Sequence, residues 1–515
     1  MRWVDFKDSV KRFWNDYKRE KSGMFGLILL VILIVLAVSA PYLTSPDVPQ
    51  KWQVGWQTNP KNAPPTWVNR FSSISKAPHL VYSVKDVHIT RNSSNGYTTY
   101  VLTFAYKNKY YLPPKDVVIT GILNNASTPS QNPQMTLWVI RPPERGIKNN
   151  TMLLISGYSL PSNYTFQLSS SQDAKLNFLF WLYKNGAFKL NNMTPILNAQ
   201  MLRLYLTMNN TLMQTMGTVD LVRALMGQLV NKSTGKFVPL TLINNVPGLE
   251  GLYTFKVYIT APQGVKLNFN HMKIYFVGRT YGILGTDQMG RPIAVGLLWG
   301  TRVALAIGIS VSVTSVLLGI FIGVTSAYLG GWKDELIQRF TEFMASLPLL
   351  PMLILLSLWI ASRSAAQSSK ITLWQLVAIM VIFGWMGTEK IARSMALQIK
   401  EQTYVEAARA LGAGTGRIVF KHIVPQLLPY AFASMALSVP GAILAEAGLS
   451  FLNLTSQNMV SWGRMLNNAY NNGATVNGYW WQVIPPGLAI AIVGFVFVLI
   501  GVSLDKVLNP KLRRI

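Results

Sequence analysis

The hydrophobic residues of this chain gather in long stretches near its two ends. Residues 24–43 form an uncharged apolar stretch of 20 residues, the length that a helix needs to cross roughly 30 Å of hydrocarbon at about 1.5 Å per residue. Further stretches follow at 303–329, 347–362, 371–388, 427–449 and 482–504. The pattern predicts an all-α polytopic membrane domain with six transmembrane helices, of which the third and fourth have the least sharply marked ends.

The first stretch is expected to be an uncleaved membrane anchor. The apolar core of a secretory signal usually has about 7–15 residues. Residues 24–43 are longer than this, and no clean small-x-small cleavage site follows them.

Basic residues indicate the side of the membrane, because short cytoplasmic loops are enriched in Lys and Arg. Seven such residues precede the first stretch, and others lie after the second and fourth stretches and in the tail. The other two short loops contain only Arg363, Lys370 and Arg464. Both termini are therefore expected in the cytoplasm of a plasma-membrane protein. The predicted division is 1–23 cytoplasmic, 24–43 transmembrane, 44–290 extracytoplasmic, and 291–515 a membrane core with five spans.

The extracytoplasmic region has the pattern of a folded domain. Val81–Thr90 and Tyr97–Tyr106 are rich in β-branched and aromatic residues, and they flank the turn-forming segment Asn92–Gly96, which predicts a β-hairpin. Leu and Met recur at helical spacing in Pro195–Val230, which predicts one or two helices. Further strands are predicted at 253–260 and 272–277. We expect a mixed α/β domain with more strand than helix.

The composition excludes several classes of site. The chain has no cysteine and four isolated histidines, so neither a disulfide framework nor a metal centre is expected. Its formal net charge of +27 would favour nucleic acid in a soluble protein, but the basic residues form no compact cluster, and no nucleic-acid partner is expected. Within residues 44–290, seven Asn-x-Ser/Thr sequences predict a glycosylated outer surface in this topology. They begin at Asn92, Asn125, Asn149, Asn163, Asn192, Asn209 and Asn231.

The loop before the fifth stretch carries the most informative pattern. Residues 401–411 are good helix formers, and Gly412 and Gly414 can end a helix. Arg417–Ile423 can form a second short helix before Pro425. The sequence therefore predicts a helical elbow on the cytoplasmic side, with alanines that allow close approach of a partner.

This elbow resembles the EAA loop of binding-protein-dependent ABC importers, in which Glu-Ala-Ala is followed by a Gly and then a Pro at fixed spacing. The residues in register are Glu406, Ala407, Ala408, Gly412 and Pro425. The segment that begins at His422 is similar to the His-Ile-x-Pro form of the dipeptide and oligopeptide branch, although Gln426 replaces the usual Asn.

Other segments carry the same resemblance. Leu284–Arg291 is similar to the segment before the second span of C-type permeases, although Pro292 replaces the usual Asp. Ser461–Leu466 and Leu504–Pro510 are also similar to the family. The resemblance covers the first span and residues 280–515, and it leaves the large external region unexplained.

The resemblance implies a C-type permease subunit with the type I ABC importer fold, which forms half of a path for dipeptides and oligopeptides. It implies a related B-type permease, two ABC ATPases, an extracytoplasmic solute-binding protein and the lipid bilayer as partners. The chain contains no Gly-x4-Gly-Lys-Ser/Thr loop, so ATP and Mg are expected on the ATPases, and the chain is not expected to be an enzyme. In the elbow, Glu406 is assigned to capping, Gly412 to the turn, and His422 to Pro425 to the junction with the fifth span.

Several residues within the spans are candidates for the translocation path or a gate. Ser312 and Ser315 lie among small residues that either permit close helix packing or line the path. Glu446 is an ionisable group near the outer end of the fifth span, where it acts as a gate, packs, or lies at the interface. Pro440 is expected to kink the same span.

Three alternatives remain. The same type of permease could carry oligosaccharides. A secondary transporter or channel would not need the elbow, and a membrane-anchored surface protein would leave five spans without a purpose. The elbow therefore favours the importer.

Overall fold

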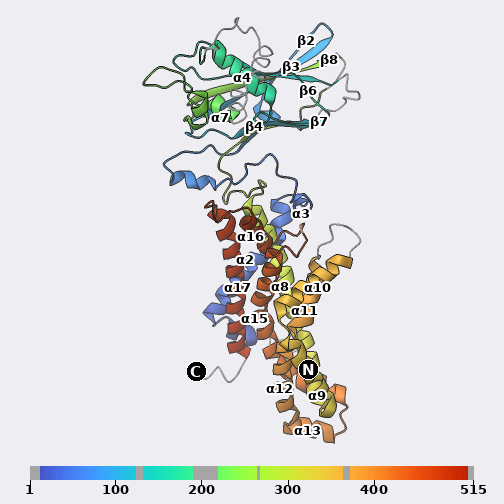
Figure 1. Ribbon diagram of the computed structural model, residues 1–515. Helices are drawn as coiled ribbons and strands as arrows, with labels where there is room; N and C mark the ends of the chain where they lie inside the picture. Colours follow the sequence, from blue (N-terminus) through green and yellow to red (C-terminus); the bar gives the residue numbers. More distant parts are fainter. Residues whose placement is uncertain are drawn as a thin grey trace. The chain divides into compact units, whose positions relative to one another are not determined.

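The computed structural model describes residues 12–122, 132–188, 219–263, 267–363, 372–456 and 458–508. The chain forms two units (Figure 1). The helical unit comprises Met1–Gly55 and Ile293–Ile515, and the sandwich unit comprises Trp56–Pro292.

Four helices of the helical unit are long and apolar enough to cross a membrane by themselves. They are α2 (Lys21–Leu43), α8 (Ile293–Leu329), α15 (Val424–Phe451) with the turns that lead into it from Thr415, and α17 (Trp480–Leu508). These helices lie side by side (Figure 1). The chain is thus a multi-pass membrane protein.

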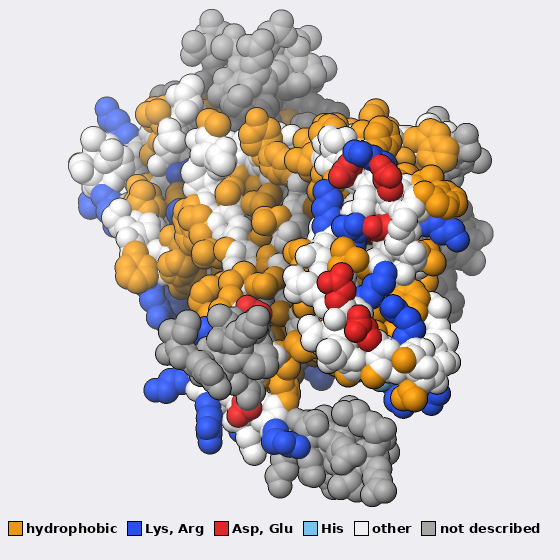
Figure 2. Space-filling model, turned by 90° about the horizontal axis from the view of Figure 1, so that it is seen from below, with side chains coloured by type: hydrophobic (Ala, Val, Ile, Leu, Met, Phe, Trp, Pro, Cys, Tyr) orange, Lys and Arg blue, Asp and Glu red, His pale blue; other side chains and the backbone are white. Residues whose placement is uncertain are grey.

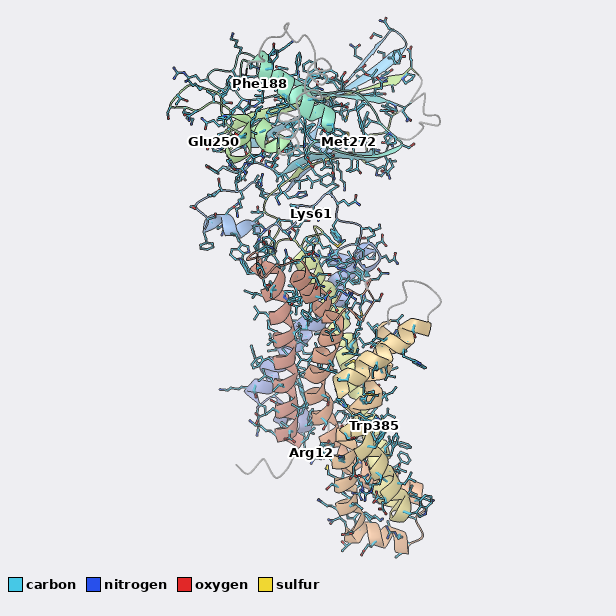
Figure 3. The ribbon with its side chains drawn as sticks, viewed as in Figure 1. Arg12, Lys61, Phe188, Glu250, Met272 and Trp385 are labelled. Atoms are coloured by element: carbon cyan, nitrogen blue, oxygen red, sulfur yellow. The ribbon has the colours of Figure 1, made fainter. Side chains whose placement is uncertain are left out.

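The third and fourth predicted spans correspond to bent helix pairs. Helix α9 (Gly331–Ser346) meets α10 (Leu349–Arg363) at 86°, and α11 (Leu373–Gly384) meets α12 (Met386–Lys400) at 43°. Leu347 is extended at the first bend because the following Pro348 disfavours helical geometry. Trp385, labelled in Figure 3, lies at the second bend. Counting each pair as one span brings the number among the described residues to as many as six.

Glycines bring these helices close together. A Cβ at Gly308 of α8 would lie 2.8 Å from a methyl carbon of Val439 on α15, and one at Gly501 of α17 would lie 2.6 Å from Leu437. Lipid tails are as apolar as the side chains of the helices, so the hydrophobic effect does not drive helices together within a membrane. Close backbone approach of this kind stabilises their association instead. A short amphipathic helix, α16 (Trp462–Asn471), packs against α15 and α17.

The sandwich unit contains two antiparallel sheets. The four-stranded sheet has the order β1 (Leu80–Ser83), β9 (Lys273–Val277), β4 (Asp116–Ile122) and β7 (Asn163–Gln167). The five-stranded sheet has the order β2 (His88–Ser94), β3 (Tyr97–Asn108), β8 (Gly251–Pro262), β5 (Gln134–Ile140) and β6 (Thr151–Ser159). The ring of Phe276 on β9 contacts those of Phe104 and Tyr106 on β3, so the sheets pack face to face.

The predicted hairpin is present, with a shifted first strand. Strands β2 and β3 pair from Ser94 and Tyr97 outward, and Asn95 and Gly96 have positive φ, as a tight hairpin turn requires. The predicted strand Val81–Thr90 is interrupted by a 3₁₀ turn, in which Ser83 and Asp86 form a capping box.

Helices in the sandwich unit depart more from expectation. Most of Pro195–Val230 lies outside the described residues, and its described part contains the short helix α7 (Leu221–Met226). Helix α4 (Gln172–Lys184) was not predicted, although Ser171 caps it by accepting a hydrogen bond from the backbone N–H of Ala174. Its buried face packs against β6.

Candidate coupling elbow and transmembrane cavity

The loop between α12 and α15 is a helical elbow. Helix α13 (Thr403–Ala410) is followed by a turn, then by α14 (Thr415–Ile418) and the single π-helical turn η5 (Val419–Ile423). At the turn, Gly412 has φ of +80°, a conformation that costs residues with a Cβ about 1–2 kcal/mol. The N–H of Ala413 donates to the carbonyl oxygen of Ala408 at 3.1 Å, which closes the end of α13.

The elbow is attached to the helical unit by one apolar face. Val405, Ile418 and Ile423 are almost completely buried and belong to one cluster with residues of α8 and α12. Leu411 at the turn is 89% exposed, and Glu406 and Ala407 are also exposed. The elbow therefore presents its tip and the Glu-Ala-Ala segment away from the unit. Hydrophobic, acidic and basic side chains are mixed over the end formed by α9, α12 and α13 (Figure 2).

Glu406, the expected capping residue, lies inside α13 and not at its N-cap. Gln402 is the N-cap of α13 and makes no side-chain cap hydrogen bond. Glu406 lies one turn into the helix, where a carboxylate is favoured by the positive end of the helix dipole. Its exposed side chain is available to a partner.

The junction with α15 has its own contacts. The His422 ring lies 6.2 Å from the Tyr404 ring, centroid to centroid, and the Gln426 amide donates to the Tyr404 hydroxyl. These contacts join α13 to the beginning of α15. Pro425 is the second residue of α15 and follows directly on the π-helical turn η5, so its missing N–H falls where the hydrogen bonds already depart from the regular helical pattern.

A cavity of about 190 Å³ lies between four helices of the helical unit. Its lining comes from α8 (Val311, Ser312, Ser315), α10 (Leu349, Leu353), α11 (Met380, Phe383, Gly384) and α15 (Ser438, Gly441, Ala442, Ala445). The cavity is mainly apolar, with hydroxyl groups from three serines. The Ser312 hydroxyl donates to the carbonyl oxygen of Met435. A mainly apolar lining with a few polar groups is typical of small-molecule sites.

Glu446 and Pro440 are absent from this lining. The Glu446 carboxylate is buried and accepts a hydrogen bond from the Ser450 hydroxyl at 2.6 Å. Ser450 contacts the hydroxyls of Thr455 and Ser461 at 2.8 and 3.2 Å. These bonds tie α15 to the segment that begins α16. Pro440 lies inside α15.

The apolar part of the cavity was not predicted. Leu353, Met380 and Phe383 have the composition of ordinary membrane-helix residues, and no sequence signal distinguishes them from core. Of the predicted glycosylation sites, Asn92, Asn149, Asn163 and Asn231 are exposed. The other three, Asn125, Asn192 and Asn209, lie outside the described residues. Among the described residues, no group of three His, Cys, Asp or Glu side chains could hold a metal ion.

Comparisons with known proteins identify what the chain is similar to. Residues 315–514 match the family of binding-protein-dependent transport system inner membrane components, and residues 10–65 match the N-terminal transmembrane domain of oligopeptide transport permease C. The oligopeptide transport system permease protein OppC of Bacillus subtilis is 36% identical over 231 residues, which cover 45% of this chain and 72% of the relative. The dipeptide permease DppC of the same organism is 33% identical over 45% of this chain and 69% of its own length. An OppC of Lactococcus lactis is 30% identical over 50% and 85%, respectively.

Proposed function

Since this chain belongs to the oligopeptide and dipeptide family of binding-protein-dependent ABC importers, as a C-type permease subunit, we propose that its elbow is the contact through which separate ATPases drive peptide transport. The chain is a transport permease and not an enzyme. The observation that carries the proposal is the two-sided elbow, which is buried on one side and free at its tip.

The elbow has the mechanical properties that this role needs. Its apolar face is continuous with the cluster that holds α8 and α12 together, so a force on the tip is transmitted to two membrane helices. The exposed Glu406, Ala407 and Leu411 offer a small, partly apolar surface for a groove on an ATPase. ATP and Mg would be bound by the ATPases, and each round of binding and hydrolysis would displace the elbow.

We propose that the cavity between α8, α10, α11 and α15 is the half of the translocation path that this chain contributes. The serine hydroxyls can hydrogen-bond to peptide groups, while the apolar wall accepts different side chains. Ser312 and Ser315 are the path residues in this proposal, and Glu446 instead fixes the outer end of α15. A B-type permease would supply the other half, and a binding protein would deliver the peptide.

The positive-inside pattern supports an orientation with the elbow and both termini in the cytoplasm. In this orientation the sandwich unit is extracytoplasmic, and its four exposed sequons could carry glycans. We propose that the sandwich unit is an insertion into the permease, because neither family match covers residues 66–314.

Substitutions at Gly412 test the coupling role. Gly412→Val puts a β-branched residue into a left-handed conformation, whereas Gly412→Asn places there a residue that tolerates it. Gly416→Ala is the control, because a Cβ at Gly416 meets no atom within 4 Å and its φ is not positive. The variants are assembled with the second permease, the ATPases and the binding protein in nanodiscs, and peptide-stimulated ATP hydrolysis is measured.

We expect Gly412→Val to lose the stimulation, and Gly412→Asn and Gly416→Ala to keep most of it. Stimulation that survives in Gly412→Val would contradict the role of the turn. Failure of the unmodified chain to bind any ATPase in the assembled membrane would refute the proposed function itself.

A further inference from the structure

A group of polar side chains joins three helices beside the elbow. The Arg393 guanidinium of α12 donates from Nε and from one terminal nitrogen to the two carboxylate oxygens of Asp334 on α9, at 2.7 and 2.6 Å. The Ser326 hydroxyl of α8 donates to the same carboxylate at 2.5 Å. A bidentate guanidinium–carboxylate pair fixes the orientation of both partners as well as their distance. We call this group, together with Gln338 and Glu389, the α9–α12 clamp.

A second side-chain hydrogen bond of the clamp also joins α9 to α12. The Gln338 amide of α9 donates to the Glu389 carboxylate of α12 at 2.7 Å and to the Ser326 hydroxyl at 3.3 Å. Glu389 is 0% exposed, and Asp334 and Arg393 retain only 14% and 29% of their side-chain exposure. Partly buried charge-assisted bonds resist separation, because breaking one leaves two charged groups without their partner in a place that water reaches only in part.

The large apolar side chains of α9 point away from α12, so they contribute little to the contact between the two helices. Its largest apolar side chains, Trp332, Leu336, Phe340 and Phe343, are 53–71% exposed. They are spaced along one face of the helix, whereas Asp334, Gln338 and the buried Thr341 lie on the other. Most of α9 is therefore held on α12 by hydrogen bonds and charge, and less by burial of its apolar side chains.

The clamp lies on a continuous path between the elbow and the cavity. Helix α12 ends at Lys400, three residues before α13 begins, and the Lys400 ammonium donates to the carbonyl oxygens of Ala327 and Tyr328 near the end of α8. At its other end, α9 continues through the bend at Leu347 into α10, whose Leu349 and Leu353 line the cavity. The clamp is thus a side-chain link between the helix that enters the elbow and the helix that leads to the cavity wall.

We propose that Asp334 and Arg393 are positioning residues that make α9 move with α12, so that displacement of the elbow reaches α10 and changes the cavity. This inference rests on the proposed function, because it assumes that the elbow receives the force. Without the clamp, the elbow and α12 could still respond to the ATPases, but α9 and α10 would no longer follow. The consequence is less transport for each ATP that is hydrolysed, although α11, which continues directly into α12 and also lines the cavity, would still follow.

The test measures peptide uptake and ATP hydrolysis together in proteoliposomes that contain the complete importer. Asp334→Asn and Arg393→Gln remove the ion pair with little change of shape. We expect the number of peptides transported per ATP to fall about five- to tenfold, while peptide-stimulated hydrolysis stays within about twofold. Arg339→Gln is the matched control, because Arg339 is on the same helix and pairs with Glu335 and Glu342 but is 74% exposed. The control should leave the ratio unchanged.

A covalent substitute for the clamp separates coupling from simple stabilisation. The chain has no cysteine, so the double variant Asp334→Cys and Arg393→Cys can be joined with a short bis-methanethiosulfonate, which forms a reducible disulfide with each thiol and releases methanesulfinate. We expect the double variant to be uncoupled, to regain the transport ratio after cross-linking, and to lose it again when the link is reduced. The two single-cysteine variants treated in the same way are the controls.

Three results would overturn the inference. They are an unchanged transport ratio in Asp334→Asn and Arg393→Gln, a proportional fall of transport and hydrolysis, and a cross-linked double variant that remains uncoupled. Failure of the proposed function would look different, since the unmodified importer would then show no peptide-stimulated hydrolysis.

Discussion

The close packing of α8 on α12 gives a quantitative prediction at Gly323. A Cβ added to Gly323 would lie 2.5 Å from the carbonyl oxygen of Glu389 and 2.9 Å from the backbone nitrogen of Arg393. Both atoms belong to the backbone of α12, so no side-chain rotation can relieve the contact. Gly323→Ala therefore forces the two helices apart.

The cost can be separated from helix propensity with a control on α12. Ala is favoured over Gly in a helix by about 0.8–1.0 kcal/mol, and this gain is common to Gly323→Ala and Gly387→Ala. A Cβ at Gly387 meets no atom within 4 Å. The difference in unfolding free energy between the two variants thus isolates the overpacking strain, which we expect to be about 1–3 kcal/mol.

The assay is equilibrium unfolding of the purified chain in mixed micelles by titration with a denaturing detergent. Gly323→Ala should unfold at a lower detergent fraction than the unmodified chain, and Gly387→Ala at the same fraction or a higher one. Equal stability of the two variants would show that α8 and α12 are not in contact at this position, and the packing account would be wrong.

Three other predictions concern the sandwich unit and the cavity. Arg141→Met should destabilise the chain by about 3–5 kcal/mol, because Arg141 pairs with Glu144 at 3.1 Å and the two side chains are only 1% and 5% exposed. Chemical unfolding measures this loss. Adding Glu144→Gln to Arg141→Met should recover part of the stability. Burial lowers the pKa of His79 from 6.5 to about 4, so the stability that neutral His79 contributes is present above about pH 6.5 and is lost as the pH falls towards 4. Thermal unfolding of His79→Phe should depend less on pH in this interval than that of the unmodified chain. Ser315→Leu should fill the cavity and reduce peptide uptake at least about tenfold without preventing assembly, and normal uptake would exclude the cavity from the path.

Local pattern was sufficient to predict the elements whose signals lie within one segment. The Glu-Ala-Ala segment, Gly412 and Pro425 specify the elbow through helix propensity and one left-handed turn. The hairpin turn at Asn95 and Gly96 is specified in the same way. Helix α4 had a readable start at Ser171, followed by Asp173, and the signal was missed beside the stronger strand patterns around it.

Contacts between distant segments could not be predicted from one sequence. Asp334 and Arg393 are 59 positions apart, and each looks like an ordinary charged residue of a cytoplasmic loop. Glu446 shows the same limit, since its position near the outer end of the span left open a gate, a packing role and an interfacial location. Only the fold shows that the Ser450 hydroxyl, one turn further along α15, donates to the Glu446 carboxylate and in turn contacts Thr455 and Ser461.

The helical unit also explains why a large segment can occupy the connection between its first two spans. Near the points where this segment begins and ends, α2 and α8 are joined within the helical unit itself: the Trp299 indole N–H donates to the Thr44 hydroxyl at 2.9 Å, and Trp52, 2% exposed, lies against Gly296. Because these contacts hold α2 on α8 without any residue of the sandwich unit, the connecting segment can change in length without loss of the helix packing. The matched relatives agree with this independence, since 45% of this chain covers 72% of the Bacillus subtilis OppC. The helix packing of the membrane core is therefore held by its own contacts.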